Sequence, residues 1–359
     1  MSVHSSASEL ATHSALRVGL LRSPARHPRT VESAIRAGLT EAGHRLHLAG
    51  QPRLRGVPVR EIARELSNHD IAIVQYECDS GHTRRGANLL DVLGAVCSPA
   101  ILVLHSIPSH PSSRMEDLVV NLCDSAALVV VMSGAAKHVL TRTYPVEERK
   151  VVVIPWGAST ACAAGPCAHA DGGLLTMGDL IPGLGAEHLI DAVAILHSKG
   201  IAVRCTISSQ SPSRSPYGIE MGRRAREAGV EHLVTITEGG DDLGRLISSA
   251  AIVVLPYESD EMLVSPALVD SIAAGRPVIA TSFPHARELL RDGAGLVVPP
   301  RNAVALAEAI RVAMTDRVIM DAMTARARLL APSVSWRRAQ RAFAQRCTSL
   351  ADQRERLAA

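Results

Sequence analysis

Short apolar runs alternate with longer amphipathic stretches through the first half of the chain. The runs predict buried strands, and the stretches, in which apolar residues recur every three or four positions, predict helices. This alternation is typical of βαβ units, whose parallel strands are covered on both faces. Taken in turn as strand and helix, the predicted elements are Leu16–Leu21, Val31–Ala42, Ile71–Gln75, Asn88–Val96, Ala100–His105, Arg114–Ser125, Leu128–Met132, Gly134–Tyr144 and Lys150–Pro155.

The same alternation returns in the second half, after a stretch from Gly157 to Gly173 that is rich in Ala, Gly, Ser and Pro and reads as a linker. An Arg-rich amphipathic helix over Ser335–Ala359 follows without a strand partner, and we expect it to cross back to the first domain. Again in turn as strand and helix, the second set is Leu174–Met177, Ala186–His197, Ala202–Ser208, Ile219–Ala228, Leu233–Thr237, Leu243–Ala250, Ile252–Pro256, Pro266–Ala274, Pro277–Thr281, Ala286–Leu290, Gly295–Val298 and Ala303–Met314.

The fold class predicted is α/β, with two Rossmann-like domains whose parallel sheets face each other across a cleft. The boundaries expected are a disordered tail over 1–14, an N-terminal domain over 15–160, a linker over 161–172, a C-terminal domain over 173–332, and a helix over 333–359 that packs on the N-terminal domain. Because such sheets bind ligands beyond the carboxyl ends of their strands, we expect a small-molecule site between the domains.

Charge and composition narrow the classes of ligand. The net charge is only +3 and basic residues form no block, so nucleic acid is not expected as a partner. The only lysines in the chain are Lys137, Lys150 and Lys199, so a phosphate site must rely on arginine, backbone amides or helix N-termini.

Seven cysteines without regular spacing argue against a disulfide framework and favour a reducing compartment. Cys162, Cys167 and His169 resemble metal ligands, but no second pair follows, so no metal site is expected. No apolar run is long enough for a signal peptide or a membrane span. We expect a cytoplasmic protein, with contact to a membrane surface or to a partner enzyme left open.

The most informative segment runs from Val253 to Pro300. Ser265 is placed to be the N-cap of a helix and Pro266 its first residue, and the amides of such a helix start can bind a diphosphate. Asp270 lies one turn further on, where its carboxylate can accept hydrogen bonds from a ribose.

Within this segment, VSPALVDSIAAGRPVIATSFPHARELL resembles the donor-binding signature of glycosyltransferase family 4, in the subgroup that reads SGVLVDAIAAGRPVVATAFPHAVELL. The segments VQYECDSGH, LVLHSIPSHP, LVVVMSGAAKHVL, KVVVIPWGAS and TMGDLIPGLGAEHLIDAVAIL resemble others of that subgroup or family, in the same order, so the resemblance covers about residues 70–315. It implies the GT-B fold and a retaining transfer, without metal or cofactor, from a UDP- or GDP-type sugar to a hydroxyl of a small molecule, a glycan or a lipid-linked acceptor.

The resemblance also implies roles for single residues. Gly183 and Gly185 would line the diphosphate, and Ser265 with the amides of Ala267 and Leu268 would cap it. Asp270 would hold the ribose. From the N-terminal domain, His105 and Glu77 would face the acceptor and the transferred sugar, and the catalytic pair would be His105 and Glu261. Arg84 either contacts an anionic acceptor or is simply solvated.

The chain departs from the family pattern at several of these positions. Leu184 stands where the family has a lysine beside the diphosphate, and Arg204, Arg214 or Arg276 could compensate, although the sequence does not show that any of them reaches the site. The first acidic position of the family's pair falls on Met262, next to the candidates Glu258, Asp260 and Glu261. Pro266 replaces a glycine and removes one amide, and Tyr76 and Trp156 replace histidines.

These departures keep a second function open, a degenerate member that binds a nucleotide sugar or a partner enzyme without catalysis. A nucleotide-sugar epimerase is weaker, because its Glu/His signature is absent. Two further side chains carry alternatives. His285 either points at the nucleotide or caps its helix, and Glu288 is expected to pair with an arginine on a helix surface.

Overall fold

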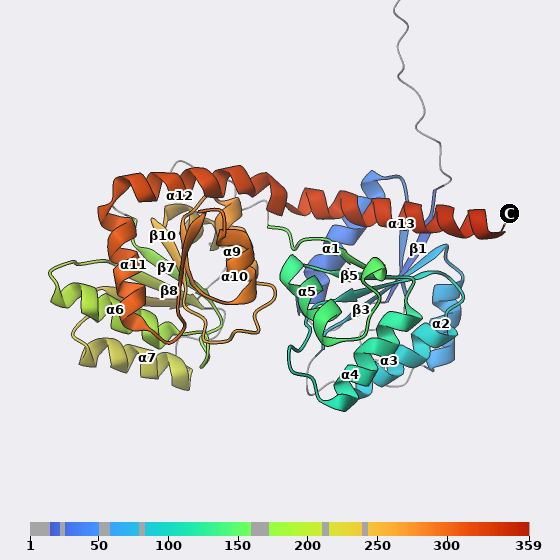
Figure 1. The fold of residues 1–359 in the computed structure, drawn as a ribbon, viewed down its shortest axis with the longest axis horizontal. Helices are drawn as coiled ribbons and strands as arrows, with labels where there is room; N and C mark the ends of the chain where they lie inside the picture. Colours follow the sequence, from blue (N-terminus) through green and yellow to red (C-terminus); the bar gives the residue numbers. More distant parts are fainter. Residues whose placement is uncertain are drawn as a thin grey trace, which may run out of the picture. The chain divides into compact units, whose positions relative to one another are not determined.

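The computed structural model describes residues 15–21, 26–49, 58–78, 83–158, 172–209, 215–238 and 243–358 (Figure 1). These residues form two parallel six-stranded sheets, each flanked by helices. The α/β fold class predicted from the alternating pattern is therefore confirmed.

The first sheet has the strand order β2-β1-β3-β4-β5-β6. Its central strands β3 and β4 are buried along their whole length, because helices cover both faces. Its strands are β1 (Arg17–Leu21), β2 (Arg45–Ala49), β3 (Ile71–Tyr76), β4 (Ala100–Leu104), β5 (Leu128–Val131) and β6 (Val151–Val153). The helices along this part of the chain are α1 (Arg26–Glu41), α2 (Val59–Ser67), α3 (Thr83–Ala95), α4 (Ser113–Ser125) and α5 (Gly134–Thr143).

The second sheet has the order β12-β11-β10-β7-β8-β9. Its strands are β7 (Leu174–Gly178), β8 (Cys205–Ser209), β9 (Val234–Glu238), β10 (Ile252–Leu255), β11 (Val278–Thr281) and β12 (Gly295–Val298). Its helices are α6 (Ala186–Ser198), α7 (Pro216–Glu227), α8 (Leu243–Ser249), α9 (Pro266–Ala273), α10 (Pro284–Leu290), α11 (Ala303–Thr315) and α12 (Arg317–Leu330). The core between β7, β8, β10 and the helices consists of Leu, Ile, Val, Ala and Met side chains, as the low aromatic content requires.

Three elements escaped the sequence pattern: β2, α2 and α12. The strand β2 lies at the edge of the first sheet and buries only Ala49 fully, so it carries little of the apolar signal that marks a central strand.

Both sheets reverse their winding direction next to their first strand. In the first sheet β1 lies between β2 and β3, and in the second β7 lies between β8 and β10. At such a point the connections on the two sides run to opposite faces and leave a crevice beyond the carboxyl ends of the strands. In the second sheet, the loops after β7 and β10 therefore border the expected position of a ligand site.

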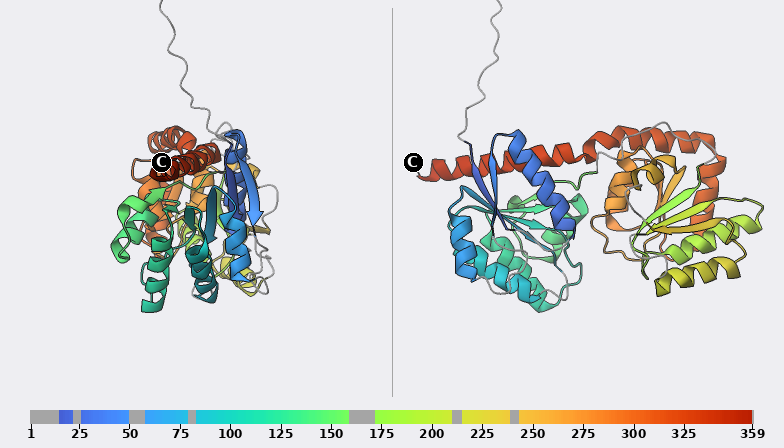
Figure 2. Two further views of the ribbon diagram at one scale, coloured as in Figure 1. Left: turned by 90° about the vertical axis from the view of Figure 1, so that its right-hand side faces the viewer. Right: turned by 180° about the vertical axis from the view of Figure 1, so that it is seen from behind.

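The described residues divide into two compact units: those within 1–105, 112–130 and 340–359 form the first, and those within 106–111 and 131–339 form the second. The last helix, α13 (Trp336–Ala358), reaches the first unit and runs beside α1 (Figure 2). A Cβ added at Gly38 of α1 would lie 2.2 Å from the carbonyl oxygen of Gln340, so the two backbones cross closely. His44 and Thr348 are joined by a hydrogen bond of 3.1 Å. The C-terminal helix thus returns to the first domain, as its amphipathic pattern predicted.

No helix in the described part of the chain combines the length and the hydropathy that a membrane span requires.

Candidate functional site

The glycine loop, residues 178–185, packs directly against the segment that follows β10. Gly185 has φ +76, and a Cβ at this position would lie 1.9 Å from the carbonyl oxygen of Pro256. The Glu258 N–H donates to the carbonyl of Gly183 over 2.9 Å. Only glycine allows this approach of two backbones, which brings the loops of the two strands at the switch point together.

The outer side of the glycine loop is open. A Cβ on Gly183, which has φ +91, would meet no atom within 4 Å. Leu184 is half-buried, and its Cδ1 would lie 3.6 Å from a Cβ on Gly178. The loop therefore offers free space beside backbone amides, but the side chain between its glycines is apolar.

The helix α9 begins beside this loop segment with a buried cap. Ser265 is 1% exposed, and its Oγ accepts the Leu268 N–H over 3.2 Å. Pro266 has no N–H to donate. Among the described residues, Ala267 thus carries the one amide in the first turn for which no hydrogen bond is found. An anion approaching this helix would meet the Ala267 amide first.

His285 and Tyr257 hold the N-cap residue Ser265 in place through hydrogen bonds. His285 is 3% exposed, and its Nδ1 accepts the Ser265 N–H over 2.9 Å. Burial lowers the pKa of His285 to about 4, so the imidazole is neutral. The Tyr257 hydroxyl hydrogen-bonds to the Ser265 side chain, and burial raises the pKa of Tyr257 to about 12. Neither of the two alternatives considered for His285 describes this arrangement, because the ring supports the cap of a neighbouring helix.

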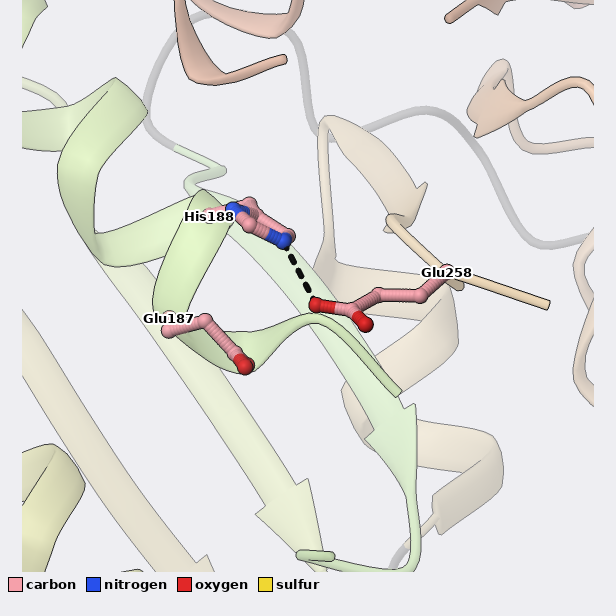
Figure 3. Close-up of side chains that lie close together, drawn as sticks. All are labelled: Glu187, His188 and Glu258. Atoms are coloured by element: carbon pink, nitrogen blue, oxygen red, sulfur yellow. Dashed lines mark hydrogen bonds and ion pairs between the residues drawn. The ribbon is translucent and has the colours of Figure 1, made fainter. Parts of the chain in front are cut away.

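A charged cluster, Glu187, His188, Glu258 and Arg301, lies at the start of α6, and Figure 3 shows the first three of these side chains. His188, in the first turn of α6, is hydrogen-bonded through Nε2 to Glu258 over 2.7 Å. Arg301, which follows β12, donates its Nε–H to the other carboxylate oxygen of Glu258 over 3.1 Å. Partial burial acts to raise the pKa of Glu258, but the hydrogen bonds from His188 and Arg301 outweigh it and keep that pKa below its ordinary value. Glu258 is therefore a carboxylate that holds two donors beside the glycine loop.

Three groups in this cluster have the spacing of metal ligands. Glu187, His188 and Glu258 each offer one ligand atom, and these atoms all lie within 4.8 Å of one another. In the structure Glu258 is engaged by His188 and Arg301, and Glu187 accepts a hydrogen bond from the Tyr217 hydroxyl. A cation at this place would have to displace several of these hydrogen bonds.

The sequence of this region is similar to a known family, and the fold of the chain is similar to that of solved structures. Residues 172–316 match the sequence model of the family described as glycosyl transferases group 1. This stretch, residues 172–316, is called the group 1 domain after that similarity. No curated protein sequence matches the chain.

A glycosyltransferase from Rickettsia africae has a TM-score of 0.79 at 15% identity, over 94% of this chain and 99% of that one. HepE of Anabaena, solved with UDP, has a TM-score of 0.75 at 17% identity, over 93% of this chain and 100% of that one. Sucrose-phosphate synthase of Thermosynechococcus elongatus has a TM-score of 0.72 at 18% identity, over 94% of this chain and 98% of that one. At these identities the likeness establishes the fold, which is that of the GT-B glycosyltransferases.

The residues predicted to bind the donor lie in two segments of the group 1 domain. Gly183, Gly185, Ser265, Ala267 and Leu268 belong to the glycine loop or to the first turn of α9. The amide of Leu268 is already bonded to Ser265 Oγ, so within this set the structure leaves Ala267 and the glycine loop open to a ligand. Asp270 lies half-buried in α9, one turn beyond the cap.

The acidic residue in contact with the glycine loop is Glu258. Glu261, predicted to be catalytic, is exposed, and its amide hydrogen bonds to Ser259 Oγ over 3.0 Å. The sequence offered Glu258 only as one of three acidic candidates, because spacing along a loop does not reveal which side chain turns toward a neighbouring loop. A catalytic role for Glu261 stays a prediction.

The arginines proposed to compensate for Leu184 lie elsewhere. Arg204 directly precedes β8 and Arg276 precedes β11, so both stand at the amino-terminal edge of the sheet, opposite the glycine loop. Arg276 is also buried, with 1% of its surface exposed. Arg214 lies outside the described residues, as do Cys162, Cys167 and His169. The proposal that Arg204 or Arg276 compensates is therefore wrong, and the arginine at the correct edge is Arg301.

In the first sheet, Glu77 follows β3 and His105 follows β4, so both lie at the carboxyl edge of neighbouring strands. His105 Nε2 is 3.0 Å from Gln75 Oε1. The backbone of Arg84 lies in the first turn of α3, and its side chain is outside the described part of the structure. The roles of all three toward an acceptor stay predictions.

Glu288 and Trp156 have structural contacts. The carboxylate of Glu288 accepts the N–H groups of Gly134 and Ala135, over 2.9 and 2.7 Å, and so caps α5. Its partner is thus a helix start and not the arginine that was expected. Trp156 packs against Trp336 with ring centroids 5.2 Å apart.

Proposed function

We propose that the chain is a retaining glycosyltransferase, which moves a sugar from a UDP- or GDP-type donor to a hydroxyl of a small molecule, a glycan or a lipid-linked acceptor. The observation that carries the proposal is the junction of the glycine loop with the segment after β10, within the group 1 domain. Two solved structures of one protein of the same fold, HepE of Anabaena, hold UDP and UDP-glucose respectively.

In this proposal the diphosphate lies between the glycine loop and the first turn of α9. The Ala267 amide and the positive end of the α9 dipole face it, and the half-buried Asp270 accepts a hydrogen bond from the ribose. As the bond between sugar and phosphate breaks, negative charge grows on the leaving diphosphate, and fixed donors placed there stabilise the transition state. His105 and Glu77 of the first unit serve the acceptor, and the transfer needs no metal ion.

The test is a panel of UDP and GDP sugars screened by thermal shift and calorimetry with the full chain. We expect at least one to raise Tm by several degrees, because a ligand that binds only the folded state stabilises it. Release of UDP or GDP in the presence of candidate acceptors then measures transfer, and NMR of the product reads its anomeric configuration. EDTA should leave the rate unchanged.

The outcomes separate the alternatives. If none of the nucleotides binds, the proposal is wrong. Binding without turnover under every acceptor supports the non-catalytic accessory subunit, for which the apolar Leu184 is the structural argument. An inverted product contradicts the retaining mechanism alone.

Leu184→Lys restores the family's cation at the loop and is expected to tighten UDP binding about tenfold, since a charge-assisted hydrogen bond contributes roughly 1.5–3 kcal/mol. The half-buried position suits the aliphatic stem of lysine, whose ammonium group can reach the open side of the loop. Calorimetry with UDP measures the change. Leu184→Met, of similar volume and without charge, is the control, and an equal gain in both variants would contradict the electrostatic explanation.

A further inference from the structure

The inference concerns Arg301 and rests on the proposed function. We propose that Arg301, oriented by Glu258, supplies the positive charge that contacts the diphosphate of the nucleotide sugar, in place of the lysine that Leu184 replaces. Arg301 is then a binding residue of the donor site that neither the family resemblance nor the sequence pattern identifies.

The position of Arg301 at the carboxyl edge of the second sheet supports this assignment. It follows β12, as the glycine loop follows β7 and Glu258 follows β10, and all three strands are parallel. One residue links the two features, because Glu258 donates its N–H to Gly183 and accepts the Arg301 Nε–H with its side chain. A single residue, Glu258, therefore connects the Arg301 guanidinium to the glycine loop, which has free space for a ligand.

The guanidinium also has donors to spare. Its Nε–H donates to Glu258, while none of the described residues accepts a hydrogen bond from Nη1 or Nη2. The Arg301 side chain is 70% exposed, whereas Glu258 is only 19% exposed. A half-buried carboxylate that fixes one side of an exposed guanidinium leaves the other side oriented for an anion.

The backbone conformation of Arg301 is one that favours glycine. Its φ is +54, and it is the one non-glycine residue at positive φ in the described part of the chain. Glycine adopts this conformation without steric cost, whereas a residue with a Cβ is strained. Strain of this kind is commonly retained where a side chain has a function. An arginine with a mostly exposed side chain and no function would not offset the strain of this backbone conformation.

Arg301 changes the charge balance of the cluster. Glu258 is balanced by Arg301 and accepts a further hydrogen bond from His188, and Glu187 is hydrogen-bonded to Tyr217. Without Arg301, the two carboxylates beside the loop would repel a diphosphate. Arg301 therefore both neutralises Glu258 and adds free donors.

Arg301→Gly tests the assignment, because glycine suits the backbone and removes the side chain. We expect UDP to bind at least tenfold more weakly by calorimetry, while the affinity for uridine, which has no phosphate, stays within twofold. Thermal unfolding of the variant should be unchanged or shifted upward, since the strain is released. Arg301→Lys, which keeps the charge, should recover part of the affinity. Arg291→Ala is the matched control: Arg291 is 74% exposed, is paired with its neighbour Asp292, and precedes β12 at the opposite edge of the sheet.

Unchanged UDP affinity in Arg301→Gly, or an equal loss for uridine and UDP, overturns the assignment and leaves the proposed function in place. An equal loss in the Arg291 control also overturns it, since the effect would then be one of general charge. If the unaltered chain binds neither UDP nor GDP, the proposed function fails, and the role of Arg301 fails with it.

Discussion

Gly185→Ala is expected to destabilise the second unit by about 2–5 kcal/mol, because a left-handed backbone costs alanine about 1–2 kcal/mol and the overlap adds about 1–3 kcal/mol. The added Cβ would lie 1.9 Å from the Pro256 carbonyl oxygen, which belongs to backbone and cannot rotate away. The glycine loop would have to separate from the segment after β10, and nucleotide binding should fall with it. Urea unfolding and calorimetry with UDP measure the two effects.

Gly183→Ala is the matched control for this prediction. Gly183 has φ +91, in the same left-handed region, but a Cβ there would meet nothing within 4 Å. Its cost should be only the backbone term of about 1–2 kcal/mol. Equal destabilisation by the two substitutions would show that the contact with Pro256 is unimportant.

Acidification is expected to destabilise the protein through His285. Burial lowers the pKa of His285 from 6.5 to about 4, so between these values the unfolded chain binds a proton that the folded protein does not. Stability from this group is complete above pH 6.5 and is lost progressively as the pH falls toward 4. From pH 7 to pH 4.5 the loss should be about 2.5 kcal/mol, since one pKa unit corresponds to about 1.4 kcal/mol.

His285→Asn isolates this contribution, because an asparagine oxygen can accept the Ser265 N–H as Nδ1 does but does not titrate. Unfolding by urea at pH 7 and pH 4.5 should show a smaller pH effect in the variant, although its stability at pH 7 is lower. The carboxylates titrate in both proteins, so their contribution to the pH dependence of stability cancels in the comparison. Parallel losses in the two proteins would contradict the assignment to His285.

Most strands and helices of both domains could be predicted from the sequence because short apolar runs and amphipathic stretches alternate regularly. The strand pattern located the carboxyl ends of β7 and β10, and the Ser-Pro pair located the start of α9. The segments that escaped, such as β2, bury too little to leave a clear pattern. Local chemistry therefore sufficed where an element signals its own boundary.

The charged cluster could not be read in the same way. Glu258 and Arg301 are separated by two strands and two helices along the chain, and they meet only because β10 and β12 end at one edge of the sheet. The His285 side chain likewise meets a neighbouring element, the start of α9, where its Nδ1 accepts the Ser265 N–H. One part of the error was avoidable, since Arg276 precedes a predicted strand and so had to lie at the opposite edge.

The crossing of Gly38 with Gln340 has a consequence for biosynthesis. Residues 340–359 are synthesised about 200 residues after the rest of the first unit. At the usual rate of translation this delay is on the order of ten seconds or more. Until then the place on α1 that Gln340 approaches is uncovered, while the second unit can already be complete. We therefore expect the nascent first unit to expose this surface until its final helix has been translated.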